Sequence, residues 1–195
     1  MIYIPGFLIG WATFPGVIIH EFAHKKACEW RNIPVTDVNY FDFSGGGHVQ
    51  HHQPRDYHDT LLISTAPLLF NSVLAVVLWA FAGLALATLL PIPLSTHQQG
   101  LAGLTFSWVA LSTGWHAIPS FVDTGHVWGV VKRYWRRSML AALLIPVVVL
   151  LYIANLLKFV WFDAIYSVSL GLIGLFLLYQ ALGVDPFGIF PLGVI

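Results

Sequence analysis

Residues 17–24 read VIIHEFAH, and in this stretch three ionisable side chains, His20, Glu21 and His24, directly follow an apolar segment that fills residues 2–19. Ionisable residues inside an apolar helix are costly: transfer scales give about 2.5–3.5 kcal/mol for an aspartate at the centre of a bilayer. Residues of this kind in membrane segments are generally retained for function. The surrounding sequence indicates which fold carries them.

The composition is that of a membrane protein. The chain has 195 residues, of which 57% are hydrophobic and 9% charged, and its mean hydropathy is +0.76. A soluble domain usually carries about 25% charged residues. Uncharged runs approach or exceed the roughly 20 residues that a spanning helix needs, and they occupy residues 2–19, 61–94, 101–122, 139–157 and 164–184. We therefore predict an all-α polytopic membrane protein with about five transmembrane helices.

The basic residues predict its orientation. They cluster after the first and third runs, whereas residues 91–100 contain no lysine or arginine. By the positive-inside rule both clusters are cytoplasmic, so HEFAH lies near the cytoplasmic face, in the cell membrane. The first run has no basic residue before it and no small-residue cleavage site after it, so we expect it to be retained. A formal net charge of zero gives no argument for a nucleic-acid partner.

A short hairpin is predicted between the first two helices. Residues 35–43 alternate between apolar and polar side chains, break at Gly45, Gly46 and Gly47, and resume at residues 48–51. Alternation, a glycine break and a second short run are typical of a β-hairpin. We assign it to residues 33–53 and expect it to associate with the membrane, where its open edges need protein or water as partners.

The HExxH spacing predicts a hydrolytic zinc site. His20 and His24 are four residues apart, so in a helix both imidazoles project from one face and can bind one metal ion. Glu21 lies beside them, where it can accept a proton from a water in the metal's open position. Zinc would polarise the scissile carbonyl, and Glu21 would act as general base.

A catalytic zinc needs a third protein ligand. Asp123 is the best candidate, because it stands at the end of the third run, at the depth predicted for HEFAH. His116 and His126 share that neighbourhood and are rival ligands, whereas Glu29 would point about 140° away from His24 around the helix. A looser group could form a second metal site or simply a polar hairpin rim, and it comprises His48, His51, His52 and His58.

The order of these motifs resembles the site-2 protease family of intramembrane zinc metalloproteases. The resemblance spans residues 14–126. It rests on HEFAH, on the hairpin with its glycine turn, on Pro54 after the hairpin, and on two later groups around prolines. The later groups are Ala66 and Pro67 with Asn71, and Pro119 with Asp123 and Gly125. The chain departs from the family pattern at Ala66, where glycine is usual, and at Thr124, which separates the aspartate from its glycine.

The resemblance implies a role for each motif. His20, His24 and Asp123 would bind one Zn²⁺ per chain, with Glu21 as the general base. Asn71 would orient the substrate or stabilise the oxyanion. The hairpin would receive an extended substrate by strand addition, through Phe43, Gly45, Gly46, Gly47, His48 and Val49. Residues 1–137 would form the catalytic core, and residues 138–195 would add two transmembrane helices and a tail.

These observations predict an endopeptidase that cuts a peptide bond in or near a transmembrane segment of a membrane protein, close to the cytoplasmic face. Its partners would be that substrate and the membrane lipids. A zinc-binding or zinc-transport protein is the alternative that better explains the histidine-rich hairpin. A catalytically inactive protease-like scaffold is a third reading, against which the intact Glu21 argues.

Overall fold

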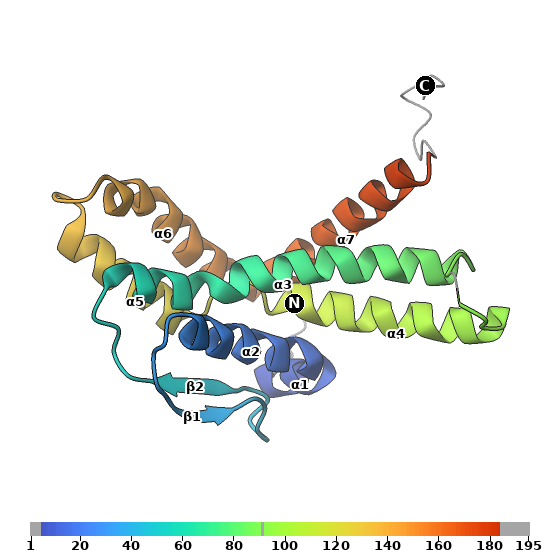
Figure 1. Cartoon of the computed structure of the whole chain (residues 1–195), viewed down its shortest axis with the longest axis horizontal. Coiled ribbons are helices and arrows are strands. Elements are labelled where there is room, and N and C mark those ends of the chain that lie inside the picture. Colours follow the sequence, from blue (N-terminus) through green and yellow to red (C-terminus); the bar gives the residue numbers. More distant parts are fainter. Residues whose placement is uncertain (1–4, 91, 184–195) are drawn as a thin grey trace.

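A computed structural model describes residues 5–90 and 92–183. Within them the chain is mostly helical, with one small antiparallel sheet, as the sequence predicts (Figure 1). The predicted runs extend to residues 2–4, 91 and 184, and the predicted tail to 195, all of which lie outside the described residues. The elements are α1 (Gly6–Ala12), α2 (Phe14–Trp30), β1 (Val35–Asn39), β2 (His48–His51), α3 (Tyr57–Leu86), α4 (Thr96–Trp115), α5 (Phe121–Tyr134), α6 (Met139–Leu157), the 3₁₀ helix η1 (Lys158–Val160) and α7 (Phe162–Ala181).

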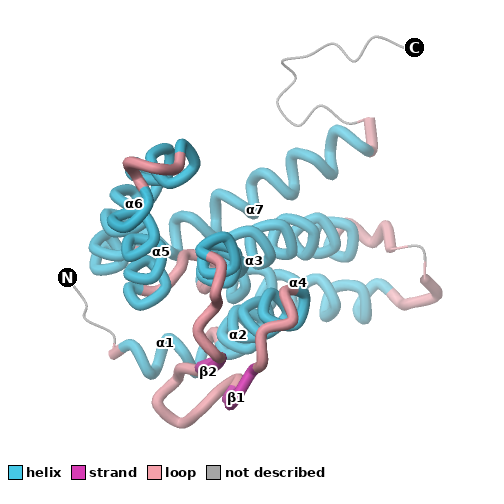
Figure 2. Tube along the Cα trace, turned by 60° about the vertical axis from the view of Figure 1, so that its left-hand side comes forward, coloured by secondary structure: helices cyan, strands magenta, loops and turns pink. Residues whose placement is uncertain are grey.

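The helices form a bundle with a helix pair attached to one end. α3 and α4 form the centre, and α2 and α7 each pack against both of them, while α5 and α6 form a pair that meets the start of α3. The hairpin lies against α2, on the side away from α7 (Figures 1 and 2). This arrangement brings the middle of α2 close to the turn that joins α4 to α5.

Among the residues that the structure describes, three helical segments are long and apolar enough to cross a membrane: Tyr57–Leu86, Met139–Val160 and Phe162–Ala181. α1 and α2 qualify as a fourth span if they are counted together, although their axes differ by 88°. The predicted five spans are therefore not confirmed. The run at 101–122 falls short because α4 begins with polar residues and carries Ser112 and Thr113 among its buried residues. A helix surrounded by other helices can place polar side chains on its neighbours instead of on lipid.

The bend between α1 and α2 has a local cause. Thr13 ends α1, and Pro15 occupies the first turn of α2, where its missing N–H is tolerated. Ser112 of α4 fixes the bend from the other side, because its hydroxyl donates to the Thr13 carbonyl at 2.6 Å and accepts from the Gly16 N–H at 2.6 Å. The first predicted helix is thus two helices at nearly a right angle.

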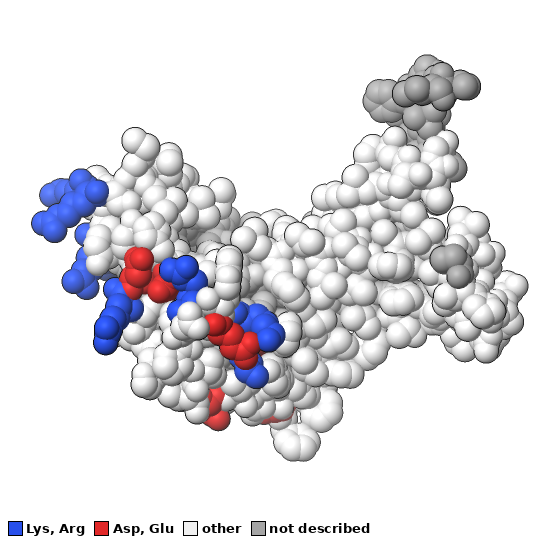
Figure 3. All heavy atoms as spheres, viewed as in Figure 1, with Lys and Arg blue, Asp and Glu red and all other residues white. Residues whose placement is uncertain are grey.

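Charged side chains gather at one end of the molecule. Figure 3 shows them over the end of α2, the start of α3 and the turn between α5 and α6, whereas the far ends of α3 and α4 and the length of α7 are uncharged on this face. Large apolar side chains are exposed along α3, α6 and α7. An apolar surface of this extent needs lipid or another protein to cover it.

The hairpin is confirmed as a two-stranded antiparallel sheet. Val38 pairs with Val49 and Asn39 with His48, and an irregularity between Val35 and Asp37 shifts the register. Only two of the six hairpin residues proposed to receive substrate, His48 and Val49, lie in a strand. Phe43 and the three glycines lie in the connecting loop, which Trp11 holds to α1 by donating from its indole N–H to the Phe43 carbonyl at 3.3 Å.

The contact between α2 and α4 depends on Gly16. A Cβ at this position would lie 2.0 Å from the Ser112 carbonyl oxygen. We expect Gly16→Ala to lower the free energy of unfolding in detergent by about 1–3 kcal/mol, measured by thermal unfolding, because the two backbones must separate. Gly100→Ala is the control, since no atom lies within 4 Å of its Cβ position. Equal stability of the two variants would contradict this packing.

Candidate metal centre

The two histidines of α2 are oriented by backbone carbonyls. The Nδ1 atom of His20 lies 2.6 Å from the His116 carbonyl oxygen, and that of His24 lies 2.9 Å from the Ile63 carbonyl oxygen. A carbonyl oxygen accepts only, so each Nδ1 carries a hydrogen, and in the neutral imidazole each Nε2 bears the lone pair. Histidines that ligate metals typically donate their other ring nitrogen to an acceptor in this way.

Asp123 completes a compact group of ligand atoms. Its Oδ1 lies 3.5 Å from His24 Nε2, its Oδ2 lies 4.0 Å from His20 Nε2, and the two Nε2 atoms are 3.2 Å apart. One ligand atom from each residue lies within 4.8 Å of the others. The sequence reasoning placed these three residues together, and the fold brings them to one point.

The donor set fits a divalent metal. Two imidazole lone pairs and a carboxylate oxygen face a common centre, and such groups repel one another unless a cation or a proton lies among them. Two histidines and one carboxylate form one of the ligand sets of catalytic zinc, which keeps its fourth position open for water or substrate. His20, His24 and Asp123 would therefore hold the metal.

Asp123 reaches the site from a helix that the sequence reasoning did not separate. We expected it at the end of the third helix, but α4 ends at Trp115 and α5 begins at Phe121. Ser120 caps α5 through a capping box, in which Ser120 Oγ accepts from the Asp123 N–H at 3.1 Å and Asp123 Oδ2 accepts from the Ser120 N–H at 3.0 Å. Ser120 Oγ also donates to Asp123 Oδ2 at 2.6 Å. These bonds fix the carboxylate and leave Oδ1 facing His24.

Asn71 of α3 supports the same turn. It is fully buried, and its Nδ2 donates to the carbonyls of Thr113 at 3.4 Å and His116 at 3.3 Å. Its Oδ1 has no hydrogen-bond partner among the described residues. Asn71 therefore holds the carbonyl that orients His20, and its donors are directed at backbone rather than at the open side of the metal group.

Glu21 lines a cleft of about 340 Å³ together with His20 and the glycine loop of the hairpin. Its side chain is 8% exposed. The loop touches it closely, because a Cβ at Gly47 would lie 2.7 Å from Glu21 Cγ. Glycine at this position allows the hairpin loop to approach the proposed general base.

The rival ligands lie elsewhere. Glu29 forms ion pairs with Lys25 and Lys26 at 3.6 and 2.6 Å. The Thr13 hydroxyl donates its hydrogen to the Ile9 carbonyl, so it accepts a hydrogen bond from His116 Nε2 at 2.8 Å. His116 Nε2 therefore carries a hydrogen and offers no lone pair to a metal. His126 is exposed on α5. Neither His116 nor His126 joins the metal group.

The histidines of the hairpin region do not converge on a second centre within the described residues. His48 pairs with Asp37 at 2.8 Å, and His51 Nδ1 donates to the His52 carbonyl at 2.8 Å. The His58 ring packs against that of Tyr57, with centroids 4.0 Å apart. These contacts agree with the interpretation that these histidines form a polar rim of the hairpin.

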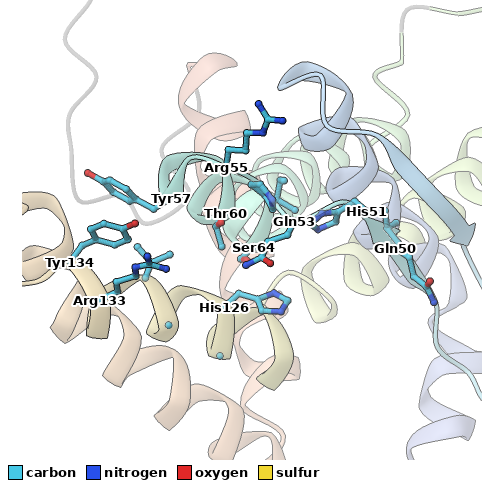
Figure 4. A pocket seen from close by; sticks show the side chains of 16 residues that line it. Gln50, His51, Gln53, Arg55, Tyr57, Thr60, Ser64, His126, Arg133 and Tyr134 are labelled. Atoms are coloured by element: carbon cyan, nitrogen blue, oxygen red, sulfur yellow. The ribbon is translucent and has the colours of Figure 1, made fainter.

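A second, larger cavity of about 790 Å³ lies between the hairpin, the start of α3 and α5. Figure 4 shows polar side chains around it, including His51 near the end of the hairpin, Ser64 on α3, and His126 and Arg133 on α5. Its lining includes Ile63, whose carbonyl orients His24, and Gly125, two residues after Asp123. The metal group thus lies near both cavities.

Two charged residues that the sequence reasoning missed line the smaller cleft: Lys158 of η1 and Asp163 of α7. The signal was present in the sequence, because each is the only charged residue of its candidate span, Met139–Val160 and Phe162–Ala181 respectively. Charged residues inside membrane spans usually face the bundle interior and mark functional sites.

Comparison with known proteins gives no relative: the chain matches no protein-family model, no curated protein and no solved structure. What the site can do is therefore argued from its own geometry.

The capping box predicts how metal affinity depends on Ser120. Ser120→Ala removes the two bonds of the Ser120 hydroxyl to Asp123 and leaves the backbone N–H of residue 120 as the remaining donor to Oδ2, and loss of a supporting bond of this kind typically weakens metal binding 10–100-fold. We expect zinc affinity, measured by competition with a chromophoric chelator, to fall by about that factor. Ser95→Ala is the matched control, since Ser95 forms a capping box with Gln98 at the start of α4. Equal zinc affinity of both variants would contradict the role of Ser120.

Proposed function

We propose that the protein is an intramembrane zinc metalloendopeptidase of the site-2 protease type, which hydrolyses a peptide bond in or near a transmembrane segment of a membrane protein. One observation carries the proposal: two imidazole lone pairs and a carboxylate converge beside a nearly buried glutamate, on a helix that follows an apolar segment. The resemblance of the ordered motifs to that family supports the same reaction class.

Each residue of the site has a separate role in the proposed reaction. Zinc held by His20, His24 and Asp123 would supply Lewis acidity to polarise the carbonyl and to make water nucleophilic at neutral pH. Glu21 takes a proton from the attacking water as its oxygen bonds to the carbonyl carbon. When the C–N bond breaks, Glu21 returns that proton to the departing nitrogen, and the products are an amine and a carboxylic acid, which then releases its own proton to water at neutral pH.

The hairpin supports a path for the substrate. A helical peptide bond must be unwound before it can be cut, and its freed backbone groups then need new hydrogen-bond partners. β2 pairs with β1 along one edge only within the described chain, so its other edge offers such partners. The glycine loop before β2 lines the smaller cleft, and Val49, Gln50 and His51 line the larger cavity, so a strand along β2 would connect them past Glu21.

We also propose a membrane topology for the chain. If α1 and α2 together form one span and α4 crosses inside the bundle, the chain has five spans, as the sequence predicts. The charged end of the molecule, which carries the basic residues after α2 and α5, would then face the cytoplasm (Figure 3). The metal ligands precede these basic residues on the same helices, with His24 next to Lys25 on α2 and Asp123 before Lys132 on α5, so the cut would fall near the cytoplasmic face of the cell membrane.

The direct test pairs metal analysis with cleavage. Wild type is expected to bind one zinc per chain and to cleave a single-span substrate in detergent. Asp123→Ala should lose zinc, because two ligands remain where a catalytic site needs three. Glu21→Gln should keep zinc and lose cleavage by at least about 10²-fold, the lower end of general acid–base catalysis.

Two outcomes would contradict the proposal. Zinc bound at several positions without dependence on Asp123, together with no cleavage of any substrate, would favour the metal-handling protein instead. Full cleavage by Glu21→Gln would remove the general base from the mechanism, even if zinc binding followed the prediction.

A further inference from the structure

Lys158 occupies an unusual position for a lysine. It is the only charged residue of the candidate span Met139–Val160, and it is half-buried at the break between α6 and α7. The other lysines and arginines lie outside this span, in residues 25–55 and 132–137. An ammonium group within an apolar segment costs free energy, so it requires a polar or charged group as a partner.

Its hydrogen bond attaches it to the turn that builds the metal group. Lys158 Nζ donates to the Ile118 carbonyl at 3.4 Å. Ile118 lies two residues after His116, whose carbonyl orients His20, and two residues before Ser120, which fixes Asp123. The ammonium group is therefore anchored to the centre of the segment that positions two of the three ligands.

Asn155 makes the attachment rigid. It stands one helical turn before Lys158, and its Nδ2 donates to the Pro119 carbonyl at 2.9 Å and to Thr124 Oγ1 at 3.3 Å. α6 thus docks on the turn between α4 and α5 through Asn155, and Lys158 is left at the wall of the cleft that contains His20 and Glu21.

The charge of Lys158 is not neutralised by a close partner. No carboxylate among the described residues lies within 4.0 Å of its Nζ, and its one hydrogen bond uses one of three donors. The charged residues that line the cleft with it are Glu21 and Asp163. The cleft therefore holds a cation with free N–H donors beside the site where we place hydrolysis.

We propose that Lys158 is a catalytic residue that stabilises the oxyanion of the reaction; this inference rests on the proposed function. As the water oxygen bonds to the carbonyl carbon, the C=O electron pair moves onto the carbonyl oxygen, and a Lys158 N–H donates a hydrogen bond to that oxygen without transferring its proton. The pair returns when the C–N bond breaks. A fixed cation in a site of low dielectric constant is well suited to this developing charge.

This role for Lys158 makes the C-terminal helices part of the site. The sequence divides the chain into a core at 1–137 and two added helices at 138–195, yet Lys158 and Asn155 come from the second part and hold the metal-building turn of the first. A cation beside the metal group also disfavours passage of zinc through this cleft, because like charges repel.

The test compares Lys158→Met with Lys158→Arg and with the control Lys132→Met, an exposed lysine of α5 outside both cavities. We expect Lys158→Met to lower kcat about 10²–10³-fold, the loss that follows removal of one oxyanion donor, with zinc content unchanged because Asn155 still docks α6 on the turn. Lys158→Arg should recover part of the rate, and Lys132→Met all of it.

A binding measurement separates this inference from the proposed function. The probe is a phosphinic peptide, whose charged tetrahedral group mimics the oxyanion, beside the same peptide with an uncharged ketomethylene group. Lys158→Met should weaken the zinc-loaded protein's binding of the phosphinic peptide at least tenfold and leave the uncharged peptide unaffected. Equal loss for both probes, or loss of zinc, would make Lys158 a structural anchor and overturn the inference. Selective loss without any cleavage by wild type would retain the anion site and reject the protease.

Discussion

The site depends on the turn at residues 116–120 between α4 and α5. Its first carbonyl orients His20 and accepts from Asn71, its last residue fixes Asp123, and the carbonyl between them anchors Lys158. Because ligands, their supports and the ammonium group come from α2, α3, α5 and η1, a small shift of this turn would change all of them together. The bundle packing that surrounds α4 holds the turn in place.

Polar groups within apolar segments have a shared explanation. Glu21, Lys158 and Asp163 line one cleft, although Glu21 lies far from the other two in the sequence. Each would be unfavourable on a lipid-facing surface, and together they line a cleft of about 340 Å³. The glycine loop of the hairpin packs against Glu21, with Gly47 next to its side chain.

Much of this architecture could be predicted from the sequence. Helical periodicity places His20 and His24 on one face, and the glycine break identifies the hairpin. The separate α5 was missed although Ser120 and Asp123 have capping-box spacing, because the apolar run continues to residue 122. The bend at Thr13 depends on the contact with Ser112 of α4 as well as on Pro15, and the support from Asn155 joins distant segments, so a local pattern encodes neither in full.

The central claim is that His20, His24 and Asp123 form one zinc centre with an open position. X-ray absorption at the zinc edge of the purified wild-type protein tests it most directly. The account predicts one zinc with two imidazole nitrogens at about 2.0–2.1 Å and further oxygen ligands at about 2.0–2.2 Å, without sulfur. A sulfur shell at about 2.3 Å, which would require Cys28, or four imidazoles, which would require the hairpin histidines, would contradict it.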